Sequence, residues 1–297
     1  MACGLVLDGG GMRSVYVAGV LDAFLDHGIR FTDCVAVADG ALNAASYLPG
    51  QRTRAFKAYT KFLGDARAFS FRRLLRTGSP LGYGFLFGDV SEQLVPLDYQ
   101  GFRRAGCRLT AVLTNCESGK AEYHVVNDLW EQRNILRAAV AYPSPENMVA
   151  IGGKHYLDGS IANPIPVQYA LRNCFAKAVV VLAHEAGHRR RAARTLPMMR
   201  LKLRKFPALL GAMNYRHIRY NRTVAHLAAW EAEGRVFVIR PTEKLKLARL
   251  GDKQDFSALY NAGVRDGVAA IDRLRAFLAA PDPGLLPRRT KQDAAEQ

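Results

Sequence analysis

The sequence of 297 residues contains no uninterrupted apolar run of the roughly 18 residues needed to span a bilayer. Acidic residues are scarce, because 26 Asp and Glu stand against 42 Lys and Arg, which gives a formal net charge of +16. This imbalance favours an anionic partner such as lipid headgroups, nucleic acid or acidic metabolites. The hydrophobic share of 49% excludes disorder for most of the chain, since that much apolar content can offset the entropy lost on ordering.

Cysteine is sparse and irregularly spaced. The five cysteines are an odd set without a C-x-x-C pair, and most of them lie in apolar surroundings. We therefore interpret them as buried, reduced thiols and not as disulfides or metal ligands. The first residues run directly into an apolar stretch at 4–7 and leave no room for a signal peptide, so we expect a cytoplasmic protein.

Short apolar runs alternate with helical patterns in the first part of the chain. Residues 4–7 predict a buried strand, and residues from 12 onward have the spacing of a helix that ends at Gly28. A second strand at 34–37 leads through a turn into a helix at 41–47. This order is typical of a parallel α/β fold.

The remainder continues the same sheet. We predict one helix at 129–140, a long helical insertion between the last two strands, and a final helix at 257–278. Residues 51–105 are more irregular. Further strands are predicted at 108–114, 121–126, 148–151, 155–157, 177–183 and 235–240.

The first motif is the glycine turn Asp8-Gly9-Gly10-Gly11-Met12-Arg13-Ser14, which follows a strand and opens a helix. Backbone N–H groups at such a helix start can hold an anion. A dinucleotide site is disfavoured, because no acid ends a second strand at the expected distance. A purely structural turn and an oxyanion hole remain as interpretations.

Two further motifs place polar or catalytic positions at strand ends. Residues 36–44, Ala-Val-Ala-Asp-Gly-Ala-Leu-Asn-Ala, occupy the strand, sharp turn and helix of a nucleophile elbow, whose usual pattern is G-x-S-x-G. Residues 156–166 place Asp158 at the end of a strand, followed by Gly159 and by two prolines that restrict the chain beyond it.

Together these three ordered motifs resemble the patatin-like phospholipase family over about residues 4–172. The resemblance implies a three-layer α/β/α sandwich with a mainly parallel central sheet and a helical C-terminal extension. It also implies hydrolysis of lipid acyl esters by a Ser–Asp dyad without a cofactor. We therefore expect a patatin-like domain at 4–172, a mainly helical region at 173–280 that adds strands to the same sheet, and a flexible tail at 281–297.

Matched to the family pattern, Gly9, Gly10 and Gly11 form the oxyanion loop with Arg13 beside them, and Asp158 is the dyad base. The nucleophile position falls on Ala38. A methyl group cannot attack an ester, and removing the nucleophile of other serine hydrolases lowers turnover on the order of 10⁶-fold.

Other pocket positions also depart from the family pattern. Asp39 follows the elbow where the family has a small residue, and its carboxylate would repel a developing oxyanion. Ser14 and Ser160 also replace small residues, but neither lies on the elbow, so we disfavour both as replacement nucleophiles. A laboratory Ser→Ala substitution would not introduce Asp39, and we therefore favour natural divergence.

Residues 184–188, His-Glu-Ala-Gly-His, match the letters of the zinc-peptidase pattern H-E-x-x-H. That chemistry requires both histidines on one face of a helix. Here the segment leaves a strand and contains a glycine, so we interpret the match as a loop coincidence and assign no metal.

The positive charge is concentrated between residues 186 and 230, which contain no acid. Interleaved apolar residues give this stretch an amphipathic character, and it is either a solvated helix face or a docking surface for anionic lipid. Of the functional interpretations, docking to an anionic membrane is favoured over nucleic acid, and it would place the protein peripherally at the inner face of the membrane. The residues expected to face the membrane are Arg189, Arg190, Arg191, Arg200, Lys202, Arg204 and Lys205.

The sequence thus supports three functional hypotheses. The first is a degenerate family member that binds an acyl lipid or phospholipid at a membrane without serine-dependent hydrolysis. The second is a working lipid acyl hydrolase with a non-standard nucleophile. The third is a basic protein associated with nucleic acid, which is disfavoured because no recognisable nucleic-acid-binding motif is present.

Overall fold

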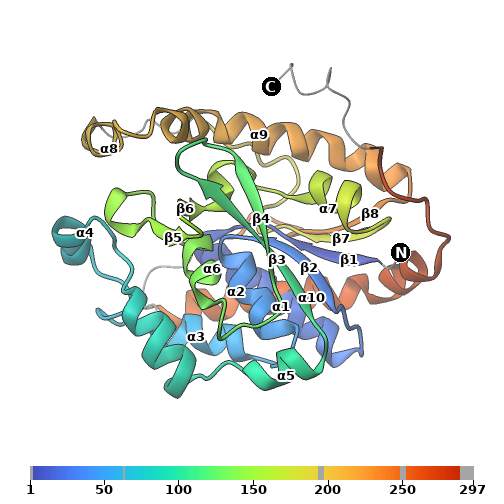
Figure 1. Ribbon diagram of the computed structural model, residues 1–297. Coiled ribbons are helices and arrows are strands. Elements are labelled where there is room, and N and C mark those ends of the chain that lie inside the picture. Colours follow the sequence, from blue (N-terminus) through green and yellow to red (C-terminus); the bar gives the residue numbers. More distant parts are fainter. Residues whose placement is uncertain (1–2, 63, 193–196, 248–251, 288–297) are drawn as a thin grey trace.

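The computed structural model describes residues 3–62, 64–192, 197–247 and 252–287. Its centre is an eight-stranded sheet in the order β5-β6-β3-β2-β1-β7-β8, with β4 paired to β3 outside this path (Figure 1). The strands are β1 Gly4–Leu7, β2 Asp33–Val37, β3 Arg108–Asn115, β4 Ala121–Val126, β5 Val149–Ile151, β6 Lys154–Asp158, β7 Ala178–Val181 and β8 Val236–Ile239.

The middle of the sheet is parallel. β1 pairs in parallel with β2 and β7, β2 with β3, and β7 with β8. β6 pairs antiparallel with β3 and β5, and β4 pairs antiparallel with β3. Because parallel strands carry their carboxyl ends to one edge, the turns after β1 and β2 lie side by side. β6 runs the other way, and its register pairs Asp158 with Leu113 near the end of β3.

Helices cover both faces of the sheet. The α-helices are α1 Ser14–Asp26, α2 Asp39–Tyr47, α3 Arg54–Phe62, α4 Phe71–Thr77, α5 Tyr99–Arg104, α6 Arg133–Ala139, α7 Val167–Asn173, α8 Pro197–Lys202, α9 Pro207–Ala232 and α10 Lys253–Ala279. Short 3-10 turns are η1 Gly11–Arg13, η3 Pro145–Asn147 and η4 Gly159–Ile161, and η2 Phe85–Leu94 is a π-helix.

Alternate residues of the buried strands enter different cores. Leu5 and Leu7 of β1 pack with α1 and α10, whereas Val6 packs with α7 and α9 on the opposite face. Successive strand side chains point to opposite faces, and both faces are buried, so these strands are apolar throughout. Figure 1 shows α7 and α9 on one side of the sheet and α1, α2 and α10 on the other. The predicted three-layer α/β/α sandwich is therefore confirmed.

The crossing of α1 and α10 depends on glycines. A Cβ atom built on Gly19 of α1 would lie 2.2 Å from the carbonyl oxygen of Tyr260, and one on Gly263 of α10 would lie 2.0 Å from that of Tyr16. Neither distance is possible for a real side chain. The two helices consequently pack backbone against backbone, and this contact seats the C-terminal helix on the N-terminal domain.

Most predicted elements are present at the expected places. The helix predicted at 129–140 is shorter, since α6 covers only Arg133–Ala139 and residues before it form turns held by the Asp128 and Gln132 side chains. The final helix is longer than predicted, because Asp252 accepts hydrogen bonds from the N–H groups of Gln254 and Asp255 and caps α10.

Part of the predicted flexible tail contacts the body. The N–H of Leu286 donates to the carbonyl of Leu171, and Arg235 donates to that of Gly284. Residues 288–297 lie outside the described residues. Across the described ranges, no helix combines the length and apolarity required to cross a membrane.

Candidate functional site

The elbow after β2 retains a strained backbone although its residue is alanine. Ala38 has φ 51° and ψ −133°, a region that residues other than glycine rarely adopt. The turn is tight, because a Cβ on Gly40 would lie 2.6 Å from the carbonyl oxygen of Asp8. The chain therefore presents the Ala38 methyl at the start of α2, where a nucleophile elbow presents its hydroxyl.

The glycine loop lies against this elbow. A Cβ on Gly9 would approach the Ala38 methyl to 2.6 Å, and one on Gly10 would approach the Ala183 methyl to 2.4 Å. Gly11 has a positive φ of 57° and begins η1. Glycine is thus required at Gly9 and Gly10 for close approach and favoured at Gly11 by backbone conformation.

Two side chains lie against N–H groups of this loop. The Ser14 hydroxyl accepts a hydrogen bond from the N–H of Gly10 at 3.1 Å, and Ser14 is fully buried. The Asp39 carboxylate lies beside the N–H groups of Gly11 and of Asp39 itself, which act to lower its pKa. Desolvation, and next the negative charge of Asp158, outweigh these N–H groups and raise the pKa of Asp39 to about 6. The loop therefore faces a carboxyl group supplied by the chain itself.

Asp158 stands at the end of β6, as predicted, and is fully engaged by Ser160. Its Oδ1 accepts from the Ser160 N–H at 2.8 Å, and its Oδ2 accepts from the Ser160 hydroxyl at 2.8 Å. Arg216 of α9 donates to the same hydroxyl at 2.6 Å. Burial raises the pKa of Asp158, and the charge of Arg216 opposes that shift.

Arg216 is a site residue that sequence reasoning placed only within the basic stretch. It lies 56 residues from Ser160 along the chain. Burial lowers its pKa, and the Asp158 charge opposes that change. No local pattern marks this contact; only the fold of α9 across the sheet brings the guanidinium to the strand-end carboxylate.

Arg190, predicted among the outward basic residues, instead points into the protein toward the glycine loop. Its guanidinium donates to the carbonyl oxygen of Gly9 at 3.3 Å and stacks 4.4 Å above the Tyr220 ring. It also opposes the effect of burial on Asp8, whose pKa is raised to about 7. Its inward position agrees with attraction by the buried Asp8 and Asp158 carboxyl groups, on both of which its charge acts.

Arg13 also points away from the elbow. Its Nη1 donates to the carbonyl of Leu245 at 2.7 Å, which ties the glycine loop to the segment before α10. The remaining predicted basic residues Arg189, Arg191, Arg200, Lys202, Arg204 and Lys205 are exposed, and Lys202 forms an ion pair with Glu146 at 2.7 Å.

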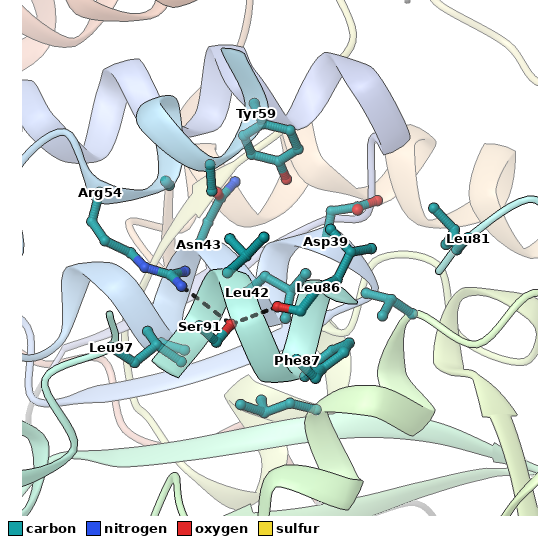
Figure 2. A pocket seen from close by; sticks show the side chains of 16 residues that line it. Asp39, Leu42, Asn43, Arg54, Tyr59, Leu81, Leu86, Phe87, Ser91 and Leu97 are labelled. Carbon is teal, nitrogen blue, oxygen red and sulfur yellow. Dashed lines mark hydrogen bonds between the residues drawn. The ribbon is translucent and has the colours of Figure 1, made fainter. Parts of the chain in front are cut away.

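A mainly apolar cavity of about 110 Å³ opens beside Asp39. Figure 2 shows Asp39 and Leu81 on one side of it and Arg54 and Leu97 on the other. Sequence reasoning missed this cavity, since its walls come from the irregular stretch 51–105 as well as from α2 and α6. It is lined by Asp39, Leu42, Asn43, Ala45, Arg54, Ala55, Ala58, Tyr59, Leu81, Leu86, Phe87, Val90, Ser91, Leu97, Leu136 and Val140.

Polar groups inside the cavity are few. Arg54 donates to the carbonyl of Val95 and to the hydroxyls of Ser46 and Ser91, and burial lowers its pKa to about 10. The amide nitrogen of Asn43 donates to the Ser14 carbonyl at 2.8 Å. Two other atoms of lining residues, Oδ1 of Asn43 and the Tyr59 hydroxyl, are buried and have no hydrogen-bond partner among the described residues. The lining is otherwise mainly apolar, so the space suits a hydrocarbon chain.

A glycine loop, a strained elbow and a strand-end carboxylate around a parallel sheet define the layout of a serine acyl hydrolase. Residues 5–171, more than half of the chain, match the family model described as patatin-like phospholipase, and the chain belongs to this family. Residues 206–279, which include α9, β8 and α10, match a second model described as a domain of unknown function.

Two individual proteins are similar to the chain. The uncharacterized protein YjjU of Escherichia coli is 27% identical over 190 residues, which are 60% of this chain and 50% of that protein. The chain therefore matches half the length of that relative. The crystal structure of VipD from Legionella pneumophila has a TM-score of 0.43 at 12% identity, covering 92% of this chain and 67% of that one.

Proposed function

We propose that this protein is a patatin-family member that binds an acyl lipid and has lost serine-dependent hydrolysis. One observation carries the proposal: in the glycine loop the Gly10 N–H is taken by the Ser14 hydroxyl, and the Asp39 carboxylate lies beside the Gly11 N–H, two side chains that depart from the family pattern. An oxyanion hole must offer free donors where charge develops, and a resident carboxylate opposes that charge.

The loss of the hydroxyl at Ala38 and the state of Asp158 support the same conclusion. An acyl transfer needs a nucleophile within about 3–3.5 Å of the carbonyl carbon and a base to take its proton. The Ser160 hydroxyl does contact a possible base, because it donates a hydrogen bond to Asp158. However, Ser160 has no exposed surface, and its hydroxyl also accepts a hydrogen bond from Arg216. This burial argues against the alternative of a working hydrolase with Ser160 as nucleophile.

The cavity supports acyl binding. Its lining is dominated by leucine, alanine, valine and phenylalanine side chains, and its one acidic residue, Asp39, lies at the elbow. Transfer of a hydrocarbon chain from water into such a space is favourable by about 0.8 kcal/mol per buried CH₂ group. A cavity of about 110 Å³ fits a short acyl segment, so the rest of the lipid would extend outside it.

A docking surface lies at one end of the molecule, where α4 and α8 project (Figure 1). Glu146 connects them, since it pairs with Lys202 at the end of α8 and its carboxylate also lies against Gly78, which follows α4. We call the exposed residues here the α4/α8 edge: Phe71, Arg72, Leu75 and Arg76 with Arg200, Leu201, Arg204 and Lys205.

The α4/α8 edge suits an anionic membrane surface. Leu75 is 86% exposed, Phe71 69% and Leu201 64%, although large apolar side chains are normally covered. Arginines beside them would meet headgroup phosphates while the apolar tips enter the interface. Leu81, which lines the cavity, follows α4 closely, so docking there would place the cavity beside the lipid source at the cytoplasmic face.

Labelling with a fluorophosphonate tests the loss of the nucleophile. We expect no adduct by intact mass, and a stoichiometric adduct on the native chain would contradict the proposal.

An octanoyl probe with an environment-sensitive fluorophore tests the cavity. Ala58→Phe, which fills it, should lower probe affinity by about tenfold or more, equivalent to about 1.4 kcal/mol, whereas the exposed Ala225→Phe on α9 should not.

A further inference from the structure

The loop after β7 brings three metal-ligating side chains together. Residues 184–188 are not helical, as predicted, yet His184, Glu185 and His188 each place a ligand atom within 4.8 Å of the other two. The imidazole rings stack with centroids 3.8 Å apart and planes 10° apart. Interpretation of the motif as a coincidence correctly excluded a peptidase helix but does not account for this convergence.

We propose that His184, Glu185 and His188 bind one divalent transition-metal ion, with Zn²⁺ as the best-fitting class. Two imidazole nitrogens and one carboxylate oxygen are a common donor set for such ions, with water as a fourth ligand. Ligands at about 2.0–2.1 Å from a tetrahedral ion lie about 3.4 Å apart, so side-chain adjustments of about 1 Å would close the site.

The state of the two histidines supports binding. The Nδ1 atom of His184 is buried and has no hydrogen-bond partner among the described residues, so its ring lacks the protein contact that usually fixes a buried histidine. The Glu185 carboxylate lies 3.9 Å from Nδ1 of His188. Both histidines pack edge-on against the Tyr220 ring, which restricts their rotation and keeps them together.

Neighbouring charge limits the site. The positive charges of Arg13 and Arg190 act on His184 and weaken the attraction of a cation, and Glu185 is the negative group that offsets them. This donor set of two imidazoles and one carboxylate therefore favours ions that bind imidazole strongly. Ca²⁺ and Mg²⁺ are disfavoured because they prefer oxygen ligands.

The position of the cluster suggests a structural role. Arg190, two residues after His188, holds Gly9 of the glycine loop. An ion bound by His184, Glu185 and His188 would fix the segment that carries Arg190 against that loop. This inference does not depend on acyl binding, so either can fail without the other.

Titration of the untagged, chelator-treated full chain with Co²⁺ tests the site through visible ligand-field absorption, and Zn²⁺ competition against a chromophoric chelator measures affinity. We expect one saturable ion per chain. Glu185→Gln, in a partly exposed loop position compatible with folding, and His188→Ala should each weaken binding on the order of 10- to 100-fold. His155→Ala and His226→Ala, outside the cluster, should bind as the parent does.

Thermal unfolding provides a second readout. Zn²⁺ should raise the midpoint of the parent and of the two control variants but not that of His184→Ala. Absence of saturable binding by the parent, or unchanged affinity in both Glu185→Gln and His188→Ala, would overturn the proposal.

Discussion

The Asp39 carboxylate lies beside the backbone N–H of Gly11, which acts to lower the pKa of that carboxyl group. In an active member of this family the same loop would stabilise the oxyanion of a lipid ester, as the sequence resemblance implies. Here the loop keeps its glycines and the elbow keeps its strained backbone, but the elbow residue is Ala38 and the carboxylate of Asp39 lies beside the loop. The proposed loss of serine-dependent hydrolysis rests on these two departures.

Asp39 should make stability depend on pH in a defined window. Its pKa is raised from 3.8 to about 6, so between these values the folded state binds more protons than the unfolded state. The free energy of unfolding contributed by this group therefore falls as pH rises from about 4 to 6 and is constant above that range. Asn at position 39 could not ionise.

Urea unfolding at several pH values measures this effect. Asp39→Asn should lose less stability than the parent between about pH 4 and 6, and the exposed Asp89→Asn should follow the parent curve. Parallel curves for the parent and Asp39→Asn would show that the carboxylate is not desolvated as described.

The crossing of α1 and α10 should tolerate no added methyl. Gly19→Ala would place Cβ 2.2 Å from the Tyr260 carbonyl, and separating the helices should destabilise the fold by about 1–3 kcal/mol or more. Gly211→Ala in α9 is the matched control, because the new Cβ would meet no other described part of the protein within 4 Å. It should stabilise by about 0.5–1 kcal/mol through helix propensity.

Equilibrium denaturation distinguishes the two glycine variants. Equal changes in both would mean that the α1–α10 contact is looser than the structure describes. A loss confined to Gly19→Ala would establish that this crossing attaches the C-terminal helix to the rest of the protein.

If the α4/α8 edge docks on a membrane, binding to vesicles should depend both on its basic residues and on its exposed apolar side chains. Leu75→Ser with Leu201→Ser should reduce sedimentation with phosphatidylserine-containing vesicles by about tenfold, since both side chains are largely exposed in the free protein. Val268→Ser, a 44% exposed position on α10, is the control and should bind as the parent does.

Salt and lipid composition separate the possible outcomes. Binding should weaken as ionic strength rises and should be much weaker with neutral phosphatidylcholine vesicles. Equal binding to neutral vesicles, or tight binding to nucleic acid with no vesicle binding, would contradict docking at this surface.

Local sequence patterns were sufficient to predict the strands of the sheet and the placement of Gly9, Ala38 and Asp158 at strand ends. Strand runs such as 177–183 are apolar because both faces are buried, and a turn between strand and helix has a recognisable composition. Patterns could not predict contacts between distant segments. Arg216 reaches Ser160 and Arg190 reaches Gly9 only through the fold, so both appeared in the sequence as surface charge.

The cavity and the histidine cluster were hidden for related reasons. Residues 51–105 lack a clear period, because α3, the π-helix η2 and their connections wrap around α2 and α6. The H-E-x-x-H pattern predicts a metal site only where its residues form a helix, and residues 184–188 do not. A loop can bring the same three side chains together, which periodicity does not indicate.

Restoration of activity tests the central claim most directly. With a p-nitrophenyl ester of a medium-length acyl chain, Ala38→Ser/Asp39→Ala should hydrolyse measurably where the parent does not, since it regains a nucleophile and removes the carboxylate beside the Gly11 N–H. Ala38→Ser alone should be slower than the double variant by roughly 10²-fold or more, because the Asp39 carboxylate still lies beside the loop. Adding Asp158→Asn should abolish the gain. A folded double variant that stays inert, or a parent that hydrolyses the ester as fast as the double variant, would contradict the account.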